Sequence, residues 1–397
     1  MARASLHEEL RWGAHIALLA LSLACTPQDE TKPADSEQSS TTSSSTTSSG
    51  TSSGFVASTG QSGGTNDADG STTSTGGGGS RGSGGGATTN GSTGSGAAGG
   101  EATLGQLTLY YLDVTEDRVV ALDAGGSRPE LVVEGAGEGP DGIAVDARAG
   151  HLYWTNMGVP SEDDGFILRS NLDGSELTTI VEPGDTFTPK QLKLDAEAGK
   201  LYWGDREGMQ VMRSNLDGSE LEVLVTIAEG DAARADRANH AVGVAIDPAG
   251  GYFYWIQKGP PNGGEGSIRR AQLVMPSGEN DRTRTDIEVL YAGLPEPIDL
   301  DLDVGAGMMY WTDRGDATVN RAPVDVPDGA DPDTRQDREV LVEGVEVAIG
   351  IWVDVSARHV YYTGTDVVGR VDLDGRNHKV LVENAGVLTG ITGARRP

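Results

Sequence analysis

Beyond residue 105 the chain consists of short runs in which apolar and polar residues alternate, separated by Gly-rich or Asp-Gly turns. One run, an aromatic pair after an apolar residue, occurs six times: LYYLD (109–113), LYWTN (152–156), LYWGD (201–205), FYWIQ (253–257), MYWTD (309–313) and VYYTG (360–364). The first tyrosines of successive runs lie 43, 49, 52, 56 and 51 residues apart. A motif that recurs with this period predicts a repeat architecture, and the spacing suits a four-stranded propeller blade.

Each repeat carries three further runs. Ahead of the aromatic pair comes a segment such as GIAVD (142–146) or GVAID (243–247), and after it comes RSNLDGSEL, identical at 169–177 and 213–221. A short apolar run such as EVLV (222–225) completes the unit. Alternation with a period of two indicates strands, and Asp-Gly is typical of tight hairpins. The sequence therefore predicts an all-β fold, a six-bladed propeller with four antiparallel strands in each blade.

The two ends of the repeat region complement each other. The first repeat lacks an inner strand on its N-terminal side, but GIT (390–392) supplies that pattern near the C-terminus. We expect this segment to pair with the first aromatic strand (107–113). Such pairing would close the ring and leave no blade without a partner.

The repeated motif resembles the YWTD (class B) repeats of the low-density-lipoprotein receptor family. MYWTD matches fully, LYWTN and LYWGD each differ at one position, and the resemblance covers roughly residues 105–394. It implies a six-bladed propeller used mainly for extracellular protein binding, and no catalytic chemistry. The cysteine-rich modules that flank such propellers in receptors are absent from this sequence, so receptor function is not implied.

The N-terminal residues indicate export. Arg3 and Arg11 precede the apolar run IALLALSLA (16–24), which is too short to span a bilayer and ends at Cys25. SLAC (22–25) is similar to a bacterial lipobox, and Cys25 is the single cysteine of the chain. We therefore expect residues 1–25 to be a lipoprotein signal peptide and Cys25 to be lipidated. Ordinary cleavage, with a cysteine of no special role, is the alternative.

The predicted anchor is followed by a linker and then by the propeller. Residues 26–100 are dominated by Ser, Thr and Gly, a composition that cannot bury enough apolar surface to fold. The propeller is assigned to residues 101–397. By resemblance to bacterial lipoproteins, Thr26 favours the outer membrane, so the expected location is the cell envelope, with the propeller at the outer membrane or cell surface.

The formal net charge of −30 narrows the range of partners. Nucleic acids and anionic lipids require a positive surface, so neither is expected as a ligand. Membrane attachment is then expected through the lipid anchor alone. Basic peptides and cations remain compatible, although the charge can equally serve solubility.

Residue types that recur in every repeat are interpreted as scaffold. The paired aromatic residues should fill the wedge between blades. The aspartates that end the inner strands, such as Asp146 and Asp354, should bind backbone N–H groups at turns. His151 and His359 occupy equivalent turn positions, and no histidine spacing suits zinc or a catalytic pairing. No catalytic residue and no cofactor is therefore predicted.

A calcium ion is the one metal considered. Six residues precede the inner strands and should ring one mouth of the channel: Asp141, Lys190, Val242, Ile298, Ile349 and Thr389. A single carboxylate in this ring gives little support to a channel metal. Asp299 and Asp301 share one strand face with Asp303, and could bind Ca²⁺ or a basic group. The alternative is hydrogen bonding between blades, with Lys193 as a partner, and the Asp-rich insertion at 325–339 is expected to be a solvated loop.

The loops after the aromatic strands are charged and specific to each blade, as binding loops on a rigid scaffold tend to be. They nominate a discontinuous ligand-binding patch of eight residues: Asp163, Asp164, Asp205, Arg206, Lys258, Asp313, Arg314 and Asp316. Acids outnumber bases in this set, which predicts a basic or amide-rich ligand segment. The preferred function is a lipid-anchored, non-catalytic propeller that binds a protein or peptide. A calcium-dependent lactonase or esterase and a passive envelope component are the alternatives.

Overall fold

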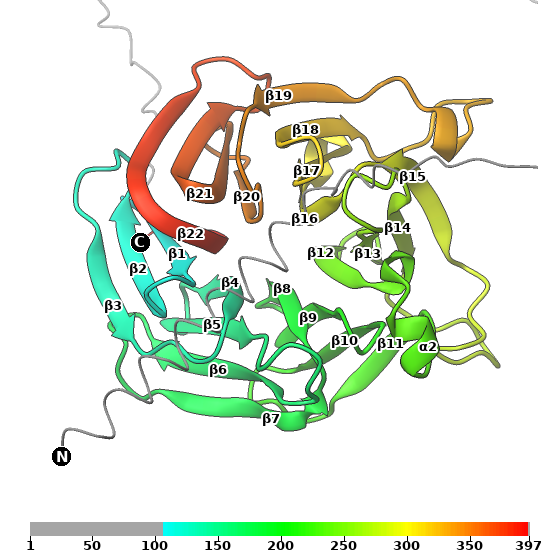
Figure 1. Ribbon diagram of the computed structural model, residues 1–397, viewed down its shortest axis with the longest axis horizontal. Coiled ribbons are helices and arrows are strands. Elements are labelled where there is room, and N and C mark those ends of the chain that lie inside the picture. Colours follow the sequence, from blue (N-terminus) through cyan, green and yellow to red (C-terminus); the bar gives the residue numbers. More distant parts are fainter. Residues whose placement is uncertain (1–105, 396–397) are drawn as a thin grey trace, which may run out of the picture. The chain divides into compact units, whose positions relative to one another are not determined.

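The computed structural model describes residues 106–395. The predicted signal peptide, Cys25 and the Ser/Thr/Gly linker lie outside the described residues. Within 106–395 the strands form five antiparallel sheets arranged in a ring around a common centre (Figure 1). The all-β propeller fold predicted from the repeats is present, and none of the helices in this part of the chain is long and apolar enough to cross a membrane.

Four of the sheets hold four strands each, in chain order from the channel outward. The first consists of β4 (Pro140–Asp146), β5 (His151–Asn156), β6 (Gly165–Asn171) and β7 (Thr178–Thr186). The second consists of β8 (Pro189–Asp195), β9 (Lys200–Asp205), β10 (Gln210–Asn215) and β11 (Glu222–Thr226). The third consists of β12 (Ala241–Asp247), β13 (Tyr252–Gln257), β14 (Gly266–Gln272) and β15 (Glu288–Leu294). The fourth consists of β16 (Pro297–Asp303), β17 (Met308–Asp313), β18 (Thr318–Pro323) and β19 (Glu339–Glu343).

The fifth sheet has six strands and contains both ends of the described chain. Its strands, in order across the sheet, are β20 (Ile351–Asp354), β21 (His359–Asp372), β22 (Lys379–Arg395), β1 (Leu107–Asp113), β2 (Arg118–Asp123) and β3 (Glu130–Glu134). The predicted pairing of residues 390–392 with the first aromatic strand is present, because Tyr110 lies opposite Thr392 and Tyr111 lies opposite Ile391.

The strands form five sheets rather than the six separate four-stranded blades that the sequence predicts. The difference arises in β21 and β22, which continue through positions where the sequence predicts a break between strands. At these positions Asp366 has φ 58° and Gly386 has φ 83°, so the chain bends without leaving the sheet. Around the channel the innermost strands nevertheless contact one another in a closed circuit, which runs β22, β4, β8, β12, β16, β20 and back to β22.

The repeated Asp-Gly turns explain why glycine is needed at those positions. Gly174 and Gly218 both have positive φ, 80° and 82°. A Cβ atom at Gly218 would lie 1.6 Å from the carbonyl oxygen of Ile180, and one at Gly174 would lie 2.0 Å from that of Val132. These hairpins therefore press against the outer strand of the preceding blade, which only glycine permits.

The aromatic residues of the repeat form the core, as predicted. Trp154, Trp203 and Trp311 are fully buried, and Trp255 is 1% exposed. Each packs with residues of the neighbouring sheet; Trp203, for example, shares a cluster with Ile167 of the preceding sheet. The aspartates that end the inner strands bind backbone N–H groups two or three residues ahead, also as predicted. His151 and His359 likewise occupy equivalent places, each edge-on to a tyrosine of the same strand.

The expectation of a solvated loop at 325–339 is wrong for Arg335, which is 5% exposed. Its guanidinium donates to the carbonyl oxygen of Leu290 (2.6 Å) and pairs with Asp337 (2.8 Å). Arg284 makes the equivalent contacts with Leu224 (3.1 Å) and Asp286 (2.7 Å). The insertion at 325–339 and a second insertion, at 274–286, are thus each bound to the outer strand of the preceding blade. The short helices of the described chain lie in loops: α2 (Asp231–Arg234), η1 (Arg237–Asn239), η2 (Val304–Ala306) and η3 (Pro332–Thr334).

Candidate functional site

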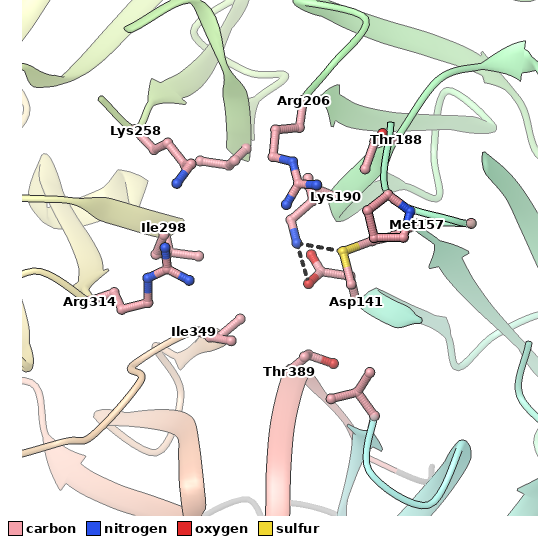
Figure 2. Close-up of a pocket in the computed structure, with 14 residues that line it drawn as sticks. Asp141, Met157, Thr188, Lys190, Arg206, Lys258, Ile298, Arg314, Ile349 and Thr389 are labelled. Atoms are coloured by element: carbon pink, nitrogen blue, oxygen red, sulfur yellow. Dashed lines mark hydrogen bonds and ion pairs between the residues drawn. The ribbon is translucent and has the colours of Figure 1, made fainter. Parts of the chain in front are cut away.

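One mouth of the channel opens into a hollow of about 720 Å³, part of it open to solvent. Two repeat positions supply most of its lining. The first is the residue ahead of each inner strand, and all six predicted ring residues are present: Asp141, Lys190, Val242, Ile298, Ile349 and Thr389. The second is the residue that directly follows the aromatic motif, and it contributes Val114, Met157, Arg206, Lys258 and Arg314. Figure 2 shows the labelled members of both sets, among them Asp141, Lys258 and Arg314, converging from several blades.

Lys190 and Asp141 form a buried ion pair at the wall of the hollow. The Lys190 Nζ atom lies 2.7 Å from Asp141 Oδ1, and the two side chains are 10% and 1% exposed. Gln191 donates to the other carboxylate oxygen (3.0 Å), and Met157 Sδ lies 2.9 Å from Nζ (Figure 2). Burial lowers the pKa of Lys190, and the Asp141 carboxylate opposes that shift.

On the far side of the hollow two cations share one carboxylate. Lys258 Nζ lies 2.7 Å from Glu296 Oε1, and Arg314 binds both oxygens of the same group, with Nε 2.9 Å from Oε2. The Glu296 side chain is 3% exposed. Burial alone would raise the pKa of Glu296, but Arg314 and Lys258 together lower it below its usual range. Burial lowers the pKa of Lys258 to about 8.

Arg206 is the fourth cation of the mouth. Its Nε atom lies 2.7 Å and 2.6 Å from the two carboxylate oxygens of Glu207. Burial acts to raise the pKa of Glu207, but the adjacent guanidinium outweighs it and lowers the value to about 2. The charge on Arg206 also acts on Lys190 and Lys258, where it lowers both pKa values, so the cations interact across the hollow.

The structure corrects the predicted ligand patch at its aspartates. Asp205 and Asp313 are 2% and 0% exposed and face the backbone rather than solvent. Asp205 accepts from the N–H groups of Phe187 (3.0 Å) and Thr188 (2.7 Å), and Asp313 accepts from that of Glu296 (2.9 Å). This final position of the aromatic motif therefore caps the loop that enters the next blade.

The remaining aspartates of the patch do not line the mouth either. Asp164 accepts from the N–H of Val159 (2.9 Å) within its own loop, and Asp163 is exposed. Asp316 pairs with Arg338 (2.9 Å). Of the eight predicted residues, only Arg206, Lys258 and Arg314 line the hollow. The expected excess of acids is therefore not found at the mouth, because four of the five predicted aspartates bind backbone or loop groups and Asp163 is exposed away from the lining. The prediction of a basic or amide-rich ligand segment loses this support.

Asp299 and Asp301 bind the backbone of the neighbouring blade. Asp299 Oδ2 accepts from the Ile351 N–H (2.9 Å) and Asp301 Oδ2 from the Val353 N–H (2.8 Å). Lys193 reaches them across the channel, with Nζ 3.9 Å and 4.0 Å from their carboxylates. This is the alternative that the sequence left open, hydrogen bonding between blades with Lys193 as a partner. Among residues 106–395 no group of three or more His, Cys, Asp or Glu side chains is arranged to hold a metal ion.

The carboxylates Glu207 and Glu296 were not among the predicted site residues. Neither occupies a repeated position. Glu207 is adjacent to Arg206 in the sequence, whereas the proximity of Glu296 to Lys258 and Arg314 follows only from the folded loops. The cations of the mouth, in contrast, could be recognised from the sequence. Three consecutive repeats place a base directly after the aromatic motif (Arg206, Lys258 and Arg314), where the first two repeats have Val114 and Met157.

Comparison with known proteins places the fold in a family. The chain is 40% identical over 289 residues to "Low-density lipoprotein receptor-related protein 1" of Pyricularia oryzae, covering 69% of this chain and 91% of that protein. The chain belongs to the low-density-lipoprotein-receptor-related family of YWTD-type propellers. No family model matches the sequence.

Two further similarities extend this comparison. "3-hydroxyacyl-CoA dehydrogenase-like protein LAM1" of Cochliobolus heterostrophus is 36% identical over 255 residues, which cover 61% of this chain and 53% of that protein. A solved structure described as "Crystal structure of Nidogen/Laminin Complex" superposes with a TM-score of 0.57 at 21% identity, covering 73% of this chain and 99% of that chain. At this identity the structural likeness shows the fold alone.

Proposed function

We propose that this protein is a non-catalytic binding propeller that captures a protein or peptide ligand over the channel mouth. The observation that carries the proposal is the mouth itself. Its hollow is lined by buried or half-buried charged side chains that three consecutive blades supply from one repeated position. Charged groups held rigidly in a concave site are suited to fixing the orientation of a ligand. A solved structure with the same fold is described as a complex of nidogen and laminin, so the fold is compatible with a protein ligand.

Catalysis is the less favoured alternative. A calcium-dependent lactonase or esterase needs several oxygen ligands that converge on the channel. The lining contributes one carboxylate, Asp141, and its oxygens are already bound by Lys190 and Gln191. The other carboxylates near the mouth, Glu207 and Glu296, are paired with cations. This arrangement favours binding over metal-assisted hydrolysis.

The proposal includes display at the cell envelope. Cys25, as the lipidated residue, would anchor the chain to a membrane, and the Ser/Thr/Gly linker would carry the propeller away from that surface. The outer membrane or cell surface remains the proposed location. We also propose that the six-stranded sheet functions as two blades, which gives the ring six repeating units in accordance with its six aromatic motifs.

Capture from the native envelope tests the function. Full-length protein and its Arg314→Gln variant would be immobilised and exposed to solubilised envelope, with Arg213→Gln as the control. Arg213 pairs with Glu222 (2.8 Å) and does not line the hollow. We expect one stoichiometric partner that the wild type and Arg213→Gln retain and Arg314→Gln loses. The absence of any stoichiometric partner would instead favour a passive envelope component.

A further inference from the structure

We infer that the channel mouth is a binding site for a single carboxylate group, held between Lys258, Arg314 and Arg206. This inference rests on the proposed function in assigning ligand binding to the mouth, and it specifies the chemistry of the group that enters. The inferred ligand group is negative, whereas the sequence predicted a basic or amide-rich ligand segment at the mouth. The first observation behind it is the charge count of the site.

The cations of the mouth outnumber their carboxylate partners. Asp141 pairs with Lys190, and Glu207 pairs with Arg206. Glu296 must serve both remaining cations of the hollow, Lys258 and Arg314. Three carboxylates therefore face four cations, and the hollow holds a surplus of one positive charge. A monoanion restores neutrality, whereas a dianion would reverse the imbalance.

The surplus charge is largely removed from water. The side chains of Lys258 and Arg314 are 8% and 12% exposed, and that of Glu296 is 3% exposed. Opposite charges attract more strongly in such surroundings than at an open surface, and a buried charge without a counter-ion is unfavourable. An anion that enters the hollow gains this interaction. The site is therefore prepared for a negative group although the whole chain carries −30.

Donor geometry also suits a carboxylate. Arg314 uses Nε and Nη2 on Glu296, and Lys258 uses Nζ once on the same group. A guanidinium has five N–H donors and an ammonium has three, so both side chains retain donors for a second acceptor. Val242, Ile298 and Ile349 form an apolar wall beside them. This combination fits a carboxylate on a short aliphatic stem: an Asp or Glu side chain, the C-terminus of a chain, or a small free acid.

The test titrates ¹³C-methyl-methionine-labelled full-length protein with acetate and, separately, with acetamide. Met157 lines the hollow, and its methyl resonance, assigned with Met157→Leu, reports occupancy. Two blocked pentapeptides, one with a central Asp and one with Asn, and a third peptide with a free C-terminus then distinguish the sources of the carboxylate. We expect saturable shifts with acetate and with at least one carboxylate-bearing peptide, and none with acetamide or the Asn peptide.

Arg314→Gln and Lys258→Met are suitable variants because each leaves Glu296 with one cation partner, so neither leaves a buried carboxylate unpaired. We expect either change to weaken acetate binding at least tenfold, while Arg213→Gln binds as the wild type does. Equal binding of acetate and acetamide, or wild-type affinity in both mouth variants, would overturn the inference. Partner capture that persists in Arg314→Gln would overturn it too, yet leave the proposed function standing. Carboxylate binding without any captured partner would contradict the proposed function, but the inferred carboxylate site would stand, with a small acid as its ligand.

Discussion

The Thr155 hydroxyl donates a hydrogen bond to the carbonyl oxygen of Lys190, 2.7 Å away on the inner strand of the next blade. The same hydroxyl accepts from the N–H of Gly142 on its own sheet (2.8 Å). Thr312 is bonded in the same way to Ile349 of the following blade. The threonine of the aromatic motif is therefore a link between blades, and one of its partners, Lys190, is also a wall of the candidate site.

Thr155→Val should therefore destabilise the fold. Valine has nearly the same shape, but it leaves the Gly142 N–H and the Lys190 carbonyl oxygen buried without a partner, which costs about 1–3 kcal/mol. Urea unfolding followed by circular dichroism would measure the change. Thr155→Ser keeps the hydroxyl and should recover most of the loss; equal stability of the Val variant and the wild type would show that the link contributes nothing.

Trp203→Ala should lower the free energy of unfolding by about 3–5 kcal/mol, the usual cost of truncating a fully buried aromatic residue. The indole ring is 0% exposed, and its Nε1 atom donates to Thr186 Oγ1 (3.1 Å). Trp352 is the matched control, because it is only partly buried and packs at the edge of its cluster. If both substitutions cost the same, burial in the wedge between blades does not explain the repeat.

Deleting residues 390–397 should lower the melting temperature strongly. The deletion removes the partners of β1 from Leu107 to Tyr111, and leaves an inner edge of the first repeat unpaired. Deleting only residues 396–397, which lie beyond the last described strand, is the control and should have little effect. A long deletion that melts within about a degree or two of the full chain would mean that this pairing is dispensable.

Carboxylate binding should weaken as the pH rises through about 8. Burial lowers the pKa of Lys258 to about 8, so its ammonium is present below that pH and is lost above it. The acid ligand is ionised from about pH 5 upward, which places the strongest binding between about pH 5 and pH 8. The charged or titratable groups that act on Lys258 or are affected by it are Glu296, Arg314, Arg206 and His240, and burial lowers the pKa of His240.

Lys258→Arg isolates this effect, since arginine keeps its charge across the range. Acetate titrations at several pH values should show an alkaline decline in the wild type that is reduced in the arginine variant. Identical profiles for the two proteins would assign the decline to another group.

Cys25→Ala should release the protein from the membrane fraction or leave its leader uncleaved. An acylated cysteine with two or more chains is a stable anchor, and the chain has no second cysteine to take its place. Fractionation and intact-mass measurement would follow both forms. Membrane partitioning equal to the wild type, with no lipid mass on Cys25 in the parent protein, would contradict the anchor.

The sequence predicted much of the scaffold because each scaffold residue recurs with the repeat. Period-two alternation identified the strands, and repetition marked Trp154 and Asp146 as structural. It also placed all six ring residues at the mouth. What it could not predict was the fate of groups whose partners lie in other loops. Asp205 and Asp313 lie next to charged loops and were therefore assigned to the ligand patch. Their carboxylates instead accept hydrogen bonds from backbone N–H groups of the loops that enter the next inner strand.

The two insertions show a different limit. TRTD (283–286) and TRQD (334–337) are nearly identical. That repetition could have identified Arg284 and Arg335 as equivalent residues that bind their loops to the outer strand of the preceding blade. The acidic composition of the insertion at 325–339 favoured a solvated loop there instead. The continuation of β21 and β22 through Asp366 and Gly386, which joins two blades in one sheet, involves positive φ angles that alternation alone does not encode.

The pairing of Leu107 with Arg395 has a consequence for how the chain folds. It joins residues that are almost the whole propeller apart in sequence, so its loop-closure entropy is the largest in the fold. Contacts of this kind slow folding, and the ring should complete only after its other sheets have formed. Joining residues 106 and 395 through a short linker, with new ends opened at the Asp374–Gly375 turn, would make this contact a local one. The closing contact would then pass to β21 and β22, where Arg370 and Lys379 pair on either side of that turn, so the place where the ring closes last depends on where the polypeptide begins, although the order of the blades does not.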